Sequence, residues 1–119
     1  MPDLKFSAFA SILCLLVLSN YAFGESQAKY AENANESWQQ QSDLTEKSYS
    51  RLLSEAESEA NKESAQQLKQ AKEKWEEFRN LFCKSVSNTY GGQWASVHES
   101  ECRVKLASQL QITTDSYGW

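Results

Sequence analysis

The feature that most constrains the fold is an apolar stripe in the second half of the chain. Between residues 68 and 86, apolar side chains recur at spacings of three and four, which place them on one face of an α-helix. They are Leu68, Ala71, Trp75, Phe78, Phe82 and Val86. Charged residues occupy the other face, so the helix must bury its stripe against another element. The sequence therefore predicts packed helices, with Trp75, Phe78 and Phe82 as core residues; a platform for a ligand is the alternative.

A second helix is predicted upstream, beginning near Ser42 and Asp43. Asp43 can cap it, and Glu46 stands three residues later, as a capping box requires. Apolar residues then follow at helical spacing, namely Tyr49, Leu52, Leu53, Ala56 and Ala60. The polar segment 61–64 weakens this pattern and contains a further capping box, Ser64 with Gln67. It is either a turn between two helices or a kink within one.

Tyr90-Gly91-Gly92 ends the central helix, because paired glycines give the backbone a freedom that a helix does not need. Ser96 and Glu99 then form a capping box for a last helix that reaches about Ile112. Strand-like alternation and internal repeats are missing from the sequence, and its one proline is Pro2. The predicted fold is all-α: a small antiparallel helical hairpin or bundle of three to four helices over residues 42–112, with an unassigned tail at 113–119.

The N-terminus has the three-part layout of a secretory signal peptide. A basic residue, Lys5, precedes an apolar run from Phe6 to Leu18, and small residues precede a cleavage point after Gly24. A membrane anchor is the alternative, but serines interrupt the run, which barely reaches the roughly 20 apolar residues of a span. Lipidation of Cys14 is disfavoured, because Ser11-Ile12-Leu13 lacks the small residues of a lipoprotein cleavage site and apolar sequence continues past the cysteine. We therefore expect cleavage of residues 1–24, no membrane span afterwards, and a periplasmic or secreted protein.

Residues 25–41 are rich in Ala, Asn, Glu, Gln and Ser, with isolated aromatic residues at Tyr30 and Trp38. So few apolar groups offset little of the entropy lost on ordering, and a flexible arm is expected here. Without residues 1–24 the chain keeps 11 basic and 15 acidic residues, a net charge of −4. The lack of a basic block argues against a nucleic-acid partner and favours a basic protein partner.

Of the chain's three cysteines, Cys14 leaves with the signal peptide. Cys83 and Cys102 remain in a chain that leaves the reducing cytosol, and a disulfide between them is the expected state. Reduced, reactive thiols are the alternative. The bond would join the central helix to the last one and would fix the loop between them, Tyr90-Gly91-Gly92-Gln93-Trp94. Such a loop is either a tight turn that covers the core edge or a rigid element that enters a partner's cleft.

Catalytic and metal-binding interpretations are weak. His98 is the only histidine, and paired cysteines cannot act as its nucleophile. Cys83, His98 and Cys102 lack the short Cys-x-x-Cys pair of most structural zinc sites. The acidic clusters at 55–63 and 76–77 lack the ligand pattern of a calcium loop and fit solvated helix faces. We therefore expect a protein that is not an enzyme and has no metal or cofactor.

The stretch from Leu68 to Cys83, with Ala71, Trp75, Phe78 and Arg79, followed by Tyr90-Gly91-Gly92 and Glu101-Cys102-Arg103, resembles the N-terminal domain of LprI-type lysozyme inhibitors. Asn80 stands where that family usually has an acidic residue, and the family's upstream cysteine is missing. The resemblance implies an exported bacterial helical domain that in some members inhibits lysozyme. The resulting hypothesis is a non-enzymatic binding protein of the cell envelope that occludes lysozyme sterically. The alternative is a structural or scaffolding module without lysozyme-directed activity; the sequence does not indicate an oligomeric state.

Overall fold

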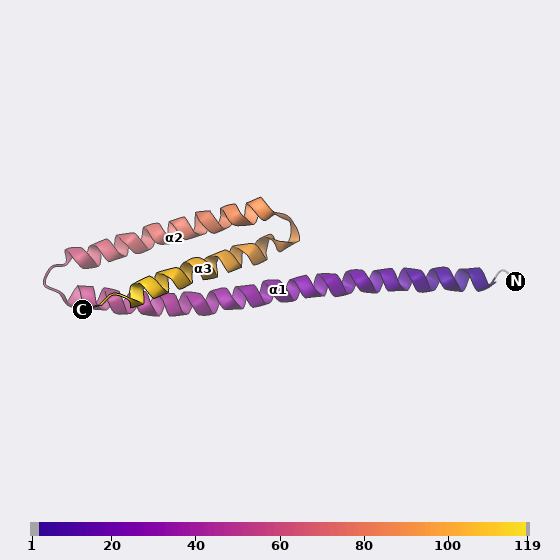
Figure 1. The fold of residues 1–119 in the computed structure, drawn as a ribbon, viewed down its shortest axis with the longest axis horizontal. Helices are drawn as coiled ribbons and strands as arrows, with labels where there is room; N and C mark the ends of the chain where they lie inside the picture. Colours follow the sequence, from indigo (N-terminus) through magenta and orange to yellow (C-terminus); the bar gives the residue numbers. More distant parts are fainter. Residues whose placement is uncertain (1–2, 119) are drawn as a thin grey trace.

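The computed structural model describes the backbone of residues 3–118 and the side chains of residues 26–118. It contains α1 (Asp3–Ser58), α2 (Glu63–Tyr90), the 3₁₀ turn η1 (Gly92–Trp94) and α3 (Ala95–Asp115). Helices α2 and α3 form an antiparallel hairpin, α3 lies between α2 and α1, and α1 extends well beyond the hairpin toward the N-terminus (Figure 1). The described residues form no strand. The predicted all-α fold is confirmed.

Residues 25–41 are not a flexible arm but part of α1, so that prediction is wrong. Tyr30, Ala34, Trp38, Gln41 and Thr45 follow one another at spacings of three and four and share one side of the helix. This side packs along α3, and burial increases from the half-buried Trp38 to the buried Thr45. Residues 25–41 are ordered by contacts with α3, which lies far along the chain. The number of apolar groups within the segment itself does not reveal such contacts.

The interruption at 61–64 is a turn rather than a kink, because α1 ends at Ser58 and α2 begins at Glu63. The predicted capping boxes do not form. Asp43 lies inside α1, and α2 and α3 begin after Lys62 and Trp94 without a side-chain cap. The start of α2 is instead held by Asn61, whose side-chain oxygen accepts a hydrogen bond from the backbone N–H of Glu63 at 3.0 Å.

The core is narrow and built largely from small residues. Its buried apolar members are Leu52, Ala56, Ala65, Cys83, Val97, Cys102 and Ala107, accompanied by the buried Thr45, Ser87 and Thr114. The hydroxyl of Thr45 on α1 lies 3.0 Å from the carbonyl oxygen of Ala107 on α3, a contact that requires the two helices to approach closely. Small side chains therefore set the distance between the helices.

The apolar stripe of α2 is only partly buried. Phe78 and Phe82 are 52% and 48% exposed, so their interpretation as core residues is wrong, while Trp75 is half-buried. The buried residues of α2 are Ala65, Cys83 and Ser87. Since consecutive helical residues are about 100° apart, placing Cys83 against α3 turns Phe82 to the side of the contact.

At the C-terminus, α3 extends past Ile112 to Asp115 and includes the first residues of the segment left unassigned. Arg51 of α1 donates hydrogen bonds to the carbonyl oxygens of Thr114 and Tyr117, at 3.1 and 3.0 Å. These contacts tie the end of the chain to α1.

Candidate partner-binding loop and the faces of helix α3

The predicted disulfide is present between Cys83 on α2 and Cys102 on α3, with the Cα atoms 5.5 Å apart. Both cysteines are buried. The bond lies close to the end of the hairpin that carries the loop, so it limits how far α2 and α3 can separate there. Buried and paired, these sulfur atoms are structural rather than reactive.

The loop depends on its two glycines. Gly91 and Gly92 have φ angles of +61° and +64°, the left-handed region in which a β-carbon is disfavoured. The backbone N–H of Gly91 donates to the carbonyl oxygen of Ser87 at 2.9 Å and closes the last turn of α2. The chain then reverses through η1 directly into α3. Sequence reasoning placed this loop correctly.

The two aromatic residues of the loop have different environments. Trp94 packs edge-on against Tyr30 of α1, with ring centroids 5.6 Å apart, and the side-chain amide of Gln27 donates to the carbonyl oxygen of Gln93. Tyr90 stacks on His98, with centroids 4.3 Å apart, but remains 68% exposed. The loop is thus braced by α1 on the Trp94 side and presents Tyr90 to solvent.

Two shallow hollows lie on either side of α3. One, of about 600 Å³, lies between α1 and α3 and is lined by Tyr30, Asn33, Ala34, Ser37, Val97, Glu101, Val104 and Lys105. The other, of about 390 Å³, lies between α2 and α3 and is lined by Phe82, Val86, Tyr90, His98, Glu101, Cys102, Lys105, Leu106 and Gln109. Glu101 and Lys105 line both, so they form a ridge between the hollows. We call this side of the molecule the open face.

The opposite side of α3 is covered by long side chains from α1 and α2, and we call it the bridged face. Arg103 lies two residues from both Glu101 and Lys105, which is about 200° around the helix. Its guanidinium carbon is 5.8 Å from the centre of the Trp38 ring, and Arg79 lies 4.8 Å from Trp38 and 5.0 Å from Trp75. Burial, reinforced by the charge of Arg103, lowers the pKa of Arg79.

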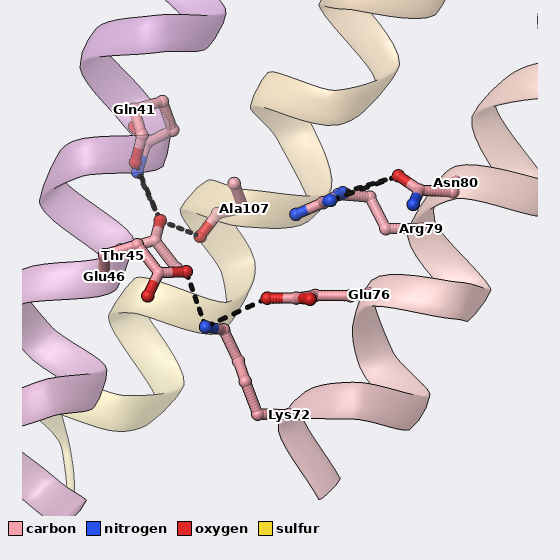
Figure 2. A network of polar contacts seen from close by, with 8 residues as sticks. All are labelled: Gln41, Thr45, Glu46, Lys72, Glu76, Arg79, Asn80 and Ala107. Carbon is pink, nitrogen blue, oxygen red and sulfur yellow. Dashed lines mark hydrogen bonds and ion pairs between the residues drawn. The ribbon is translucent and has the colours of Figure 1, made fainter. Parts of the chain in front are cut away.

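A polar network extends this bridge toward the turn (Figure 2). Lys72 of α2 is only 10% exposed and forms ion pairs with Glu46 of α1 and, at 3.1 Å, with Glu76 of its own helix. Burial by itself would lower the pKa of Lys72, but the hydrogen bonds and charges of the two carboxylates raise it. The ammonium group also lies 4.4 Å from the centre of the Tyr49 ring. Burial raises the pKa of the Tyr49 hydroxyl. Lys72 therefore links α2 to α1 across the bridged face.

The motif residues that carried the family resemblance do not form one site. Leu68, Trp75 and Arg79 are half-buried, whereas Ala71 and Phe78 are exposed. Arg79 donates to the side-chain oxygen of Asn80, so the amide there takes the accepting role that an acidic side chain would have. Sequence reasoning did not predict that Tyr30, Trp38 and Arg103 make contacts between helices. The spacing of eight residues between Tyr30 and Trp38 was the available signal, since it places both on one helical face.

The described side chains of these surfaces include exposed aromatic and charged groups. Among them, no three histidine, cysteine, aspartate or glutamate residues are grouped as a metal site requires. The carboxylate of Glu101 lies 3.9 Å from Nδ1 of His98 on an open surface. What the geometry offers is an exposed aromatic loop at one end of the hairpin and a ridge between two hollows along its side.

The fold and these surfaces define a small all-α protein in which a disulfide-linked hairpin is braced by a long N-terminal helix. A sequence model of one family, described as Lysozyme inhibitor LprI, matches residues 20–110, and the chain belongs to this family. The match includes much of α1 upstream of Ser42. Neither a curated protein nor a solved structure matches the chain. Over residues 26–118, no helical segment is long and apolar enough to span a membrane.

Proposed function

We propose that the protein is exported and inhibits lysozyme by binding it, with the Tyr90–Trp94 loop covering or entering the substrate cleft. The observation that carries this proposal is Tyr90, which is 68% exposed on a loop whose backbone is held in place. The family supports lysozyme as the target. The net charge of −4 supports a basic partner, because opposite charge speeds encounter.

The loop is suited to this role because it loses little freedom on binding. The Cys83–Cys102 bond joins the two helices about two turns from the loop, and the packing of Trp94 on Tyr30 holds the loop against α1. A binding element that is already ordered avoids part of the entropic cost of association. Exposed tyrosines on such elements are frequent centres of binding energy. Inhibition therefore needs no chemical step, only occupation of the cleft.

The test is lysozyme-catalysed lysis of a cell-wall suspension in the presence of the purified protein. We expect inhibition that Tyr90→Ala weakens by about tenfold or more, as at other tyrosine hot spots. Tyr117→Ala is the matched control, since Tyr117 is 64% exposed and follows the C-terminal end of α3, whereas the loop precedes the start of that helix. Undiminished lysozyme activity at micromolar protein would refute the inhibitor function. Equal effects of the two substitutions would refute the assignment to the loop.

Export is tested separately by the intact mass of the protein recovered from the periplasm or medium of a bacterial host. The proposal predicts a chain that begins at Glu25, after cleavage behind Gly24. Recovery of the uncleaved chain in the membrane fraction would contradict it and would favour an anchor.

A further inference from the structure

The open face carries apolar surface that the side chains of residues 26–118 do not cover. Phe78 and Phe82 stack with their ring centroids 5.5 Å apart, and Phe82 lines the hollow between α2 and α3. Both rings are about half exposed, on a chain whose mean hydropathy is −0.65. Exposed aromatic clusters on otherwise polar proteins mark interaction surfaces. The charges beside them indicate which partner fits.

Glu101 and Lys105 stand one helical turn apart on the ridge between the two hollows. The ion pairs among the described side chains do not include Lys105. A partner of uniform charge would attract one of the two ridge charges and repel the other. A second copy of the chain, with its α3 antiparallel to the first, brings each Glu101 against the Lys105 of the other copy. The ridge is therefore self-complementary, which a twofold interface requires.

We propose that the protein forms a twofold-symmetric dimer through its open face, with the α3 ridges antiparallel and the Phe78–Phe82 pair covered at the edges of the contact. Ala95, where α3 begins, lies eight residues from the midpoint of the ridge, which at the rise of an α-helix is about 12 Å along α3. The two loops consequently lie toward opposite ends of the dimer. The dimer does not depend on the proposed inhibition of lysozyme.

The test is the mass of the exported, purified protein by sedimentation equilibrium across a concentration series. Glu101→Lys places like charges at both symmetric contacts, as does Lys105→Glu, and we expect each to raise the dissociation constant at least about tenfold. The double variant Glu101→Lys with Lys105→Glu restores opposite charges and should dimerise like the wild type. Glu77→Lys, the same charge change at an exposed position of α2, is the control and should leave dimerisation unchanged.

A second pair of variants, at two adjacent residues of α2, tests the aromatic part of the proposed interface. Phe82→Ala should weaken the dimer about tenfold or more. Leu81→Ala should not, because Leu81 lines a different surface hollow with Lys84, Ser85, Asn88 and Thr89. Circular dichroism confirms that each variant is folded. A wild-type protein that stays monomeric up to about 100 µM overturns the proposal. So does a double charge variant that dissociates as readily as the single ones.

Discussion

Removing the Cys83–Cys102 bond should cost a large part of the stability of the hairpin. The two residues are separated by 19 positions, and closing a loop of that length in the unfolded chain corresponds to about 3 kcal/mol in the chain-entropy model. This is a substantial share of the roughly 5–15 kcal/mol that holds a typical domain folded. For a domain of this size we expect the melting temperature to fall by about 12–25 °C.

The assay is thermal and urea unfolding followed by circular dichroism, for the purified protein with its disulfide formed and for the double variant Cys83→Ala with Cys102→Ala. The alanine pair also removes two buried sulfur atoms, so the wild type refolded in reductant provides the comparison in which both sulfurs remain. Ser87→Ala, a small change at a buried position one turn from Cys83, controls for the truncation itself and should cost less than about 1 kcal/mol.

A reduced wild type that melts within about 4 °C of the oxidised protein would refute this reasoning. It would mean that the packing of α1 along the hairpin already holds α2 and α3 together. If the double alanine variant were less stable but the reduced wild type were not, the loss of stability would be caused by the removal of the two buried sulfur atoms rather than by the loss of the crosslink.

Three further predictions concern the bridged face and the core. The pKa of Lys72 is raised, so the folded state binds the proton of this ammonium group more tightly than the unfolded state does. The resulting contribution to the free energy of unfolding is complete below the unfolded pKa of about 10.4 and is lost as the pH rises through the folded pKa. The raised pKa of Tyr49 acts in the same direction, and Lys72→Met should reduce the loss of stability measured by urea unfolding from about pH 9 to 11; an unchanged pH slope would contradict this. Arg79→Met should cost about 1–2 kcal/mol through the lost tryptophan contacts, with Arg79→Lys costing less, and a loss below about 0.3 kcal/mol would show that the stacking is not stabilising. Leu52→Ala, at a buried position, should cost about 2–5 kcal/mol, whereas Phe82→Ala should cost clearly less although it removes a larger side chain; equal losses would place Phe82 in the core.

The sequence predicted the all-α fold, the glycine turn and the disulfide, because these depend on local spacing and on cysteine number. The glycine pair at 91 and 92 is an example, since the backbone needs positive φ angles at both positions. It was harder to predict which face of each helix packs against its neighbours. The spacing of Phe78 and Phe82 defines an apolar face, but the contact with α3 is made by smaller residues such as Cys83 and Ser87, which no hydrophobic count would rank first.

The same limit explains why residues 25–41 were expected to be flexible. Composition describes what a segment can bury by itself, and this one holds only Tyr30 and Trp38 as large apolar groups. Trp38 gains its contacts from Arg79 and Arg103, which lie on α2 and α3. Contacts between an aromatic ring and distant cations leave no periodic signal, so only the folded chain reveals them.

The arrangement of charge and aromatic residues gives the two faces of α3 different roles. On the bridged face, Lys72 and Arg79 connect α2 to α1 through carboxylates and tryptophan rings, so the helices are held together without burying much of α2's apolar stripe. That stripe is consequently free to lie on the surface, where Phe78 and Phe82 remain half exposed. A core of small residues and a bridge of long polar ones thus has a direct consequence for the surface of the protein. It leaves Phe78 and Phe82 exposed at the surface.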